Sequence, residues 1–105
     1  MDKALQQIQI TLDKIRKEAE GVEFWSARDL AKVLEYSEYR HFKPVIDKAK
    51  IACKNSGQKT KNHFEDFLEM VKIGSSAERG FDDGVKLSRY ACYLIVQNSD
   101  PSKSV

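Results

Sequence analysis

The segment from Ser88 to Asn98, "SRYACYLIVQN", constrains the fold more than any other part of the sequence. It contains no glycine or proline, which favours a helix, and Ser88 can cap its first turn. Apolar and aromatic side chains cover most of its faces: Tyr90, Ala91, Tyr93, Leu94, Ile95 and Val96. A helix that is apolar nearly all round must be buried, and 105 residues can supply one modest core. We therefore expect this helix at the centre of a single domain.

The first twenty residues predict an amphipathic helix, from about Asp2 to Glu20, that ends at Gly21. Its apolar positions recur at intervals of three and four: Leu5, Ile8, Leu12, Ile15 and Ala19. Coiled coils need about three or four heptads, and this stripe is shorter, so we expect the helix to dock on the core. A weak homodimer through this helix is the alternative. The predicted organisation is an N-terminal amphipathic helix (1–21) followed by one domain (22–105).

A strand and two helices are predicted between Val22 and Gly57. "VEFW" (22–25) is rich in residues that favour strands, and Ser26 with Asp29 has the pattern of a helix-capping box. That helix ends near Tyr36, where Ser37 can cap the next one. Pro44 lies inside the second helix, and we expect it to kink that helix or to split off a longer piece from about 43 to 54.

The second half is predicted to carry a short hairpin. "HFEDFLEM" (63–70) has apolar residues at helical spacing, whereas "MVKI" (70–73) and "VKL" (85–87) are typical of strands. The glycine-rich segment between them reads as a loop or hairpin tip. The predicted fold class is α+β: a mainly helical small domain, with about five helices and a short antiparallel β-hairpin or sheet that "VEFW" can extend.

Several classes of protein do not fit the sequence. No apolar run approaches the length of a membrane span, and the N-terminus has no apolar signal-peptide core, so we expect a cytoplasmic protein. Cys53 and Cys92 have no metal-binding or redox spacing and are predicted to be buried, reduced thiols. Asp100–Pro101 is a helix-start signal followed by only four residues, which predicts that the chain is a fragment of a longer protein.

The net charge of +2 conceals an uneven distribution. Between residues 40 and 61 seven basic residues face one acidic residue, Asp47, whereas residues 62–83 hold six acidic and two basic residues. Helices that are merely solvated usually alternate the two signs to gain ion pairs four residues apart. A basic surface with few acidic partners is therefore expected, and it indicates nucleic-acid binding.

The two helices on either side of Ser37 are spaced like a helix–turn–helix motif, in which the first residues of the second helix reach base edges. On this interpretation Arg40 reads guanine and Lys43 holds a phosphate. The predicted nucleic-acid-binding residues are Arg28, Lys32, Ser37, Tyr39, Arg40, His41, Lys43, Lys50, Lys54, Lys59 and Lys61. The turn lacks the usual glycine, so an ordinary structural corner is the alternative.

Aromatic residues in the same region allow a second mode of binding. Trp25, Tyr36, Tyr39 and Phe42 could stack on unpaired bases. Core packing is the stronger expectation for Trp25 and Phe42, whereas Tyr39, between two charged residues, is expected to be exposed.

Three blocks of the sequence resemble a known family. "EFWSARDLAKVLEYSEYRHFKPVIDKAKIAC", "HFEDFLEMVKIGS" and "LSRYACYLIVQNSDPSK" resemble the N-terminal part of the bacterial DNA-damage-inducible protein D family. The same layout is similar to the Bro family N-terminal (Bro-N) domain of antirepressor-like viral and phage proteins. The resemblance covers about Glu23 to Lys103. It implies an SOS-linked bacterial protein whose Bro-N-like domain binds DNA, single- or double-stranded.

An enzyme is disfavoured. His63, Glu65, Asp66 and Glu69 are close in sequence, but no metalloprotease, nuclease or phosphate-loop pattern is present. We expect no catalytic residue, no metal and no cofactor. The alternative function is a protein-interaction module that acts on a DNA repair or recombination protein. The salt dependence of binding distinguishes the two functions. Affinity that rests on phosphate contacts falls steeply as the salt concentration rises, whereas affinity that rests on an apolar interface does not.

Overall fold

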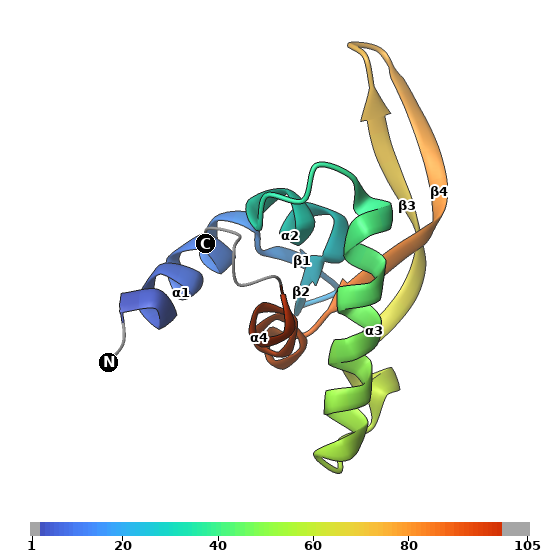
Figure 1. Ribbon diagram of the computed structural model, residues 1–105. Coiled ribbons are helices and arrows are strands. Elements are labelled where there is room, and N and C mark those ends of the chain that lie inside the picture. The colour runs from blue at the N-terminus through green and yellow to red at the C-terminus, as the bar shows by residue number, and fades with distance from the viewer. Residues whose placement is uncertain (1–2, 100–105) are drawn as a thin grey trace.

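The computed structural model describes residues 3–99. These residues form four α-helices and a four-stranded sheet, which confirms the α+β class, and Figure 1 shows how the elements are arranged. The elements in chain order are α1 (Lys3–Ile15), β1 (Lys17–Ala19), β2 (Val22–Ser26), α2 (Ala27–Val33), α3 (Tyr39–Asn55), the 3₁₀ turn η1 (Thr60–Asn62), β3 (Phe64–Ile73), β4 (Ala77–Leu87) and α4 (Arg89–Asn98). Asp100 and Pro101, the predicted helix start, lie outside the described residues.

The core forms where the helices meet the base of the sheet. α4 lies between α1 and α3 in Figure 1, and its Ala91, Cys92 and Ile95 are fully buried. The Ser88 hydroxyl accepts a 3.0 Å hydrogen bond from the Ala91 backbone N–H, so the predicted cap and central helix are both confirmed. Trp25, Phe42 and Cys53 are also fully buried, as expected.

The sheet has the order β1-β2-β4-β3, and every pairing in it is antiparallel. β1 and β2 are joined by a two-residue turn, Glu20–Gly21, in which both residues have positive φ. The prediction of one helix as far as Glu20 is therefore wrong. The helix ends at Ile15 because this turn folds residues 17–19 back as a strand paired with β2.

The connection between α2 and α3 is tight. α2 begins as predicted, with the Ser26 hydroxyl accepting from the Asp29 backbone N–H. It ends in a Schellman motif: the N–H groups of Glu35 and Tyr36 bond back to the carbonyls of Lys32 and Ala31. Glu35 occupies the left-handed position, φ 66°, that glycine usually takes, so the motif forms without one.

α3 is one continuous helix of 17 residues, and the predicted split at Pro44 is wrong. Pro44 lies in the second turn, so it removes only the bond to the Arg40 carbonyl, and burial of one helix face holds the helix together. The predicted cap is also wrong, because Glu38 occupies the N-cap position and Ser37 precedes it.

β3 and β4 form a long hairpin that projects from the body as an arm (Figure 1). The helix predicted at 63–70 is therefore wrong, since most of that segment is strand. Of the segment 74–84, predicted as a loop or hairpin tip, residues 74–76 form the tip and the rest belongs to β4. Residues 67–69 of β3 lie opposite residues 81–84 of β4, so β4 carries a bulge at Asp82–Asp83. Beyond it, residues 72–80 are all exposed.

Candidate nucleic-acid interface

α3 has one buried face and one exposed face. Phe42, Val45, Ile46, Ala49 and Cys53 lie in the core. At 100° per residue the opposite side carries Arg40, Asp47 and Ile51, with Lys43 and Lys54 on one flank and Lys48 on the other. The face is therefore basic along its edges and mixed at its centre.

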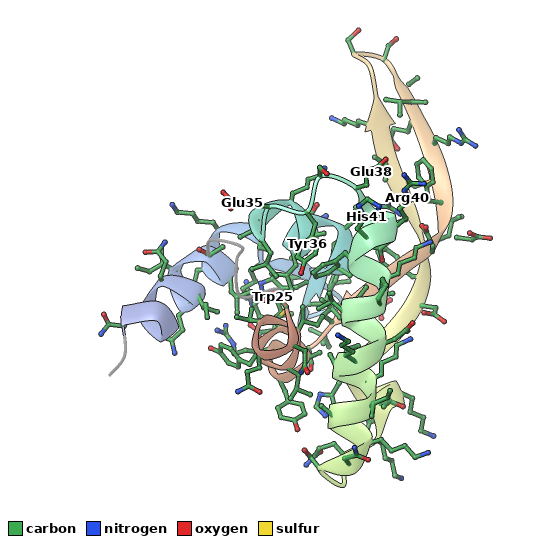
Figure 2. All side chains as sticks on the ribbon, viewed as in Figure 1. Trp25, Glu35, Tyr36, Glu38, Arg40 and His41 are labelled. Carbon is green, nitrogen blue, oxygen red and sulfur yellow. The ribbon has the colours of Figure 1, made fainter. Side chains whose placement is uncertain are left out.

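Arg40 and His41 lie at the N-terminal end of α3, next to the base of the arm (Figure 2). The Arg40 guanidinium donates two hydrogen bonds, of 3.2 and 3.1 Å, to one carboxylate oxygen of Glu38. His41 Nε2 lies 3.6 Å from the same oxygen. The Arg40 side chain is 72% exposed, and exposed pairs contribute only about 0–1 kcal/mol, so Arg40 can exchange Glu38 for a phosphate at little cost.

Arg28 is in a different environment, because its side chain is only 15% exposed. Its Nε donates to Glu69 Oε1 at 3.1 Å, and its Nη2 donates to Asp83 Oδ1 at 2.5 Å. The guanidinium carbon lies 4.2 Å from the centre of the Tyr39 ring and 5.0 Å from that of Phe81. We call Arg28, Tyr39, Glu69 and Asp83 the arm clamp.

Tyr39 closes the clamp from the helix side. Its hydroxyl donates a 2.9 Å hydrogen bond to the Asp83 backbone carbonyl, and burial raises the pKa of Tyr39 to about 12. The ring is half-buried beneath Arg28, so the expectation of an exposed Tyr39 is wrong. Tyr36, the other tyrosine of this corner, packs edge-on against Phe42 with ring centres 5.0 Å apart.

Lys43 lies beside the clamp and pairs with Asp83 at 2.7 Å. Hydrogen bonding from Lys43, with a further contribution from Arg28, holds the pKa of Asp83 below its ordinary value. The expectation of few acidic partners is therefore wrong for Arg28, Lys43 and Arg40. The partners of the first two come from the hairpin, which folds the acidic part of the chain against the basic part.

A groove of about 270 Å³ lies where these acidic and basic side chains approach each other. It runs between α3 and the bulged part of the hairpin, and its charged lining is Lys43, Asp47, Lys50, Asp66, Asp82 and Asp83. Acidic side chains outnumber basic ones here, so the inner flank of α3 is poorly suited to phosphate. The exposed face of α3 is better suited to it, because it carries Arg40 and one acidic residue, Asp47, and has Lys48 and Lys54 on its two flanks.

Comparison with known proteins identifies the family of the chain. The family model described as "BRO family, N-terminal domain" matches residues 14–105, nearly the whole chain. The chain belongs to this family. The match begins inside α1, nine residues before the earliest position at which the sequence blocks resemble the family.

A curated relative of this BRO domain is DNA damage-inducible protein D of Escherichia coli (strain K12). The two are 62% identical over 87 residues, which is 83% of this chain and 31% of the relative. The BRO domain thus spans about a third of that relative's length. No solved structure matches the chain.

The remaining predicted site residues are spread over the BRO domain. Lys32 and Ser37 are exposed near the α2–α3 connection, and Lys54 and Lys59 near the far end of α3. Lys61 lines a separate groove with residues of the β1–β2 turn. None of these four lysines makes an ion pair within residues 3–99, so each is available to a ligand.

The residues considered for catalysis do not form one site. His63 Nδ1 lies 2.7 Å from Ser88 Oγ, at the start of α4, whereas Glu69 is buried in the arm clamp. Within the described part of the chain, no three histidine, cysteine or acidic side chains converge where they could hold a metal ion. No helix of that part is long and apolar enough to cross a membrane.

Sequence reasoning missed the clamp itself. Glu69 and Asp83 lie 41 and 55 residues from Arg28, and no local pattern connects them. A basic stretch followed by an acidic stretch of similar length can pair when the chain folds back, which indicates the pair of Lys43 with Asp83. Arg28 precedes the basic stretch at 40–61, so this signal does not extend to it.

Proposed function

We propose that this BRO domain binds DNA through the exposed face of α3, as a non-catalytic part of a bacterial protein of the SOS response to DNA damage, in the cytoplasm. The observation that carries the proposal is α3 itself. One face is buried in the core, and the other presents Arg40, Lys48 and Lys54 to solvent. The family membership and the name of the curated relative support a link to DNA damage.

The arrangement of elements supports the proposal. α2 and α3 are joined by a five-residue connection, and the β3–β4 hairpin follows α3 and projects beside its N-terminal end (Figure 1). This order is that of a helix–turn–helix followed by a β-hairpin wing, an analogy of fold alone. In such motifs the first turn of the second helix enters the major groove, which assigns Arg40 to base contact and Lys48 and Lys54 to phosphates.

A fluorescence-anisotropy titration tests the proposal, with labelled duplex and single-stranded oligonucleotides at several salt concentrations. If three to five cations meet phosphates, the logarithm of the affinity falls against the logarithm of salt with a slope of roughly −3 to −5 on duplex. The double variant Arg40→Ala with Lys54→Ala should bind more weakly with a shallower slope. Lys43 is spared because it also pairs with Asp83.

Lys14→Ala is the matched control, since Lys14 is exposed at the end of α1 and makes no ion pair within residues 3–99. It should bind like the parent protein. Equal affinity of the double variant and the control would refute the proposal.

A second function rests on the arm. Leu68, Met70 and Ile73 are large apolar side chains that are about half or more exposed on it. Methionine and other apolar residues are typical of the centre of protein interfaces. This supports the alternative of a module that docks on a repair or recombination protein, and that function is favoured if the titration shows no nucleic-acid binding.

A further inference from the structure

We propose that Arg28 is a positioning residue, which fixes the direction of the β3–β4 arm relative to α3 and thereby sets the affinity for nucleic acid. The effect on affinity rests on the proposed function, whereas the effect on the arm does not. Arg28 thus acts through the arm and does not itself touch the ligand.

The first argument is the number of elements that Arg28 joins. It belongs to α2, and it donates to Glu69 on β3 and to Asp83 on β4. Its guanidinium also covers the ring of Tyr39, in the first turn of α3. One side chain therefore links both strands of the arm to both helices of the motif.

The second argument is burial. Glu69 is only 6% exposed, and its second carboxylate oxygen accepts a 2.5 Å hydrogen bond from the Ser26 hydroxyl. A buried carboxylate is costly unless it is paired, so Glu69 holds Arg28 in place as much as Arg28 holds Glu69. Such a pair favours one arrangement of the strands over others.

The third argument is the geometry of the arm. The bulge at Asp82–Asp83 lies at the clamp, and a bulge changes the direction of a strand and of its side chains. Beyond the clamp, residues 72–80 are all exposed and lie along the projecting part in Figure 1. The clamp therefore sets where the tip of the arm points.

The chemistry requires arginine. Its planar guanidinium presents donors in a fixed fork, so one side chain can bridge two carboxylates while it stacks on aromatic rings. Lysine keeps the charge but is a single compact ammonium group on a flexible chain. Arg28→Lys should therefore keep the net charge of the protein but no longer hold the arm in one direction relative to α3.

Spin labels can measure the angle directly. Cysteines introduced at Ser75, in the arm tip, and at Asn55, at the end of α3, accept labels, whereas Cys53 and Cys92 are buried. Double electron–electron resonance should give a narrow distance distribution in the parent and a broad one in Arg28→Lys. Asp83→Asn, which removes one carboxylate of the clamp, should also broaden the distance distribution. This variant provides the test if Arg28→Lys does not fold.

Arg16→Lys is the matched control. Arg16 also bridges two carboxylates, those of Glu18 and Glu23, but it is on the β1–β2 side of the sheet and far more exposed. Its replacement should leave the distance distribution unchanged. A distribution as narrow in Arg28→Lys as in the parent overturns the proposal.

Affinity supplies the second readout. If the arm spends about a tenth of its time in the competent direction, affinity should fall about tenfold. The salt slope should stay that of the parent, because no phosphate contact is lost. Arg28→Gln removes the charge that Arg28→Lys keeps. If the salt slope of Arg28→Gln is shallower than that of the parent by about one, Arg28 contacts a phosphate, and the proposal is overturned. If the parent does not bind nucleic acid, the proposed function is refuted. The spin-label distances then still test whether Arg28 fixes the direction of the arm.

Discussion

The indole N–H of Trp25 donates a 2.7 Å hydrogen bond to the backbone carbonyl of Leu12. Leu12 lies in the last turn of α1, where carbonyls have no partner within the helix. Trp25 and Leu12 are both fully buried, and Arg89 lies over the indole ring. α1 is therefore docked on the domain, as expected from its short apolar stripe. A weak homodimer through α1 stays a prediction, and Leu12 is not available to it.

Trp25→Phe should lower the free energy of unfolding by about 1–3 kcal/mol, because the buried Leu12 carbonyl loses the indole donor and the smaller ring packs less well. Urea unfolding followed by circular dichroism measures the change. Val22→Ala, an exposed position on β2, is the control and should lie within about 0.5 kcal/mol of the parent. A Trp25→Phe protein as stable as the control would contradict this role of the indole.

Two glycines of β4 should differ sharply when replaced by alanine. A Cβ at Gly84 would lie 2.7 Å from Glu69 Cβ and 2.9 Å from the Phe67 carbonyl oxygen. Because backbone atoms would have to move, Gly84→Ala should destabilise the protein by about 1–3 kcal/mol and loosen the clamp.

Gly80→Ala is the matched comparison on the same strand. The atoms nearest to its Cβ would be Leu68 Cδ1 and Met70 Sδ, in two exposed side chains, at 3.1 and 3.3 Å. These side chains can rotate away, and alanine reduces the freedom of the unfolded chain, so stability should change little or rise slightly. Urea unfolding of both variants checks the difference, and equal losses would contradict it.

The contrast between local and distant signals explains what could be predicted from the sequence. Ser26 and Ser88 cap the helices that follow them, and the apolar run after Ser88 forms the buried helix, because each signal lies within one turn of its effect. The strand at 22–26 was likewise predictable from its composition.

The hairpin was only partly predictable. Phe64, Phe67 and Leu68 have helical spacing, but pairing with β4 draws them into a strand, and the bulge breaks the alternation expected of one. The positions of the basic residues are plain in the sequence. Which of them face solvent without an acidic partner could not be predicted from it. Lys43 and Arg28 are neutralised by Asp83 and Glu69, whose approach depends on the completed fold.

The two cysteines should be unreactive in the folded protein. Burial raises the pKa of Cys92 to about 12 and also raises the pKa of Cys53, and the thiolate is the reactive form. At about pH 8 a disulfide reagent such as Ellman's reagent should modify neither residue within minutes, and both at once in denaturant. Rapid modification of one thiol without denaturant would mean that the core around it opens locally.

Stability should depend on pH through Asp83. Its pKa in the folded protein lies below the ordinary value of 3.8, because Lys43 and Arg28 favour the charged carboxylate. The unfolded chain therefore binds a proton more readily, and the stabilisation is present above that ordinary value and lost as pH falls below it. Urea unfolding at about pH 6 and about pH 3 should show a smaller loss in Asp83→Asn than in the parent. Asp82→Asn removes a neighbouring carboxylate that makes no ion pair among residues 3–99. Between the two pH values this variant should lose as much stability as the parent. If Asp83→Asn loses as much stability as the parent between these two pH values, Asp83 does not carry the acid sensitivity of the clamp.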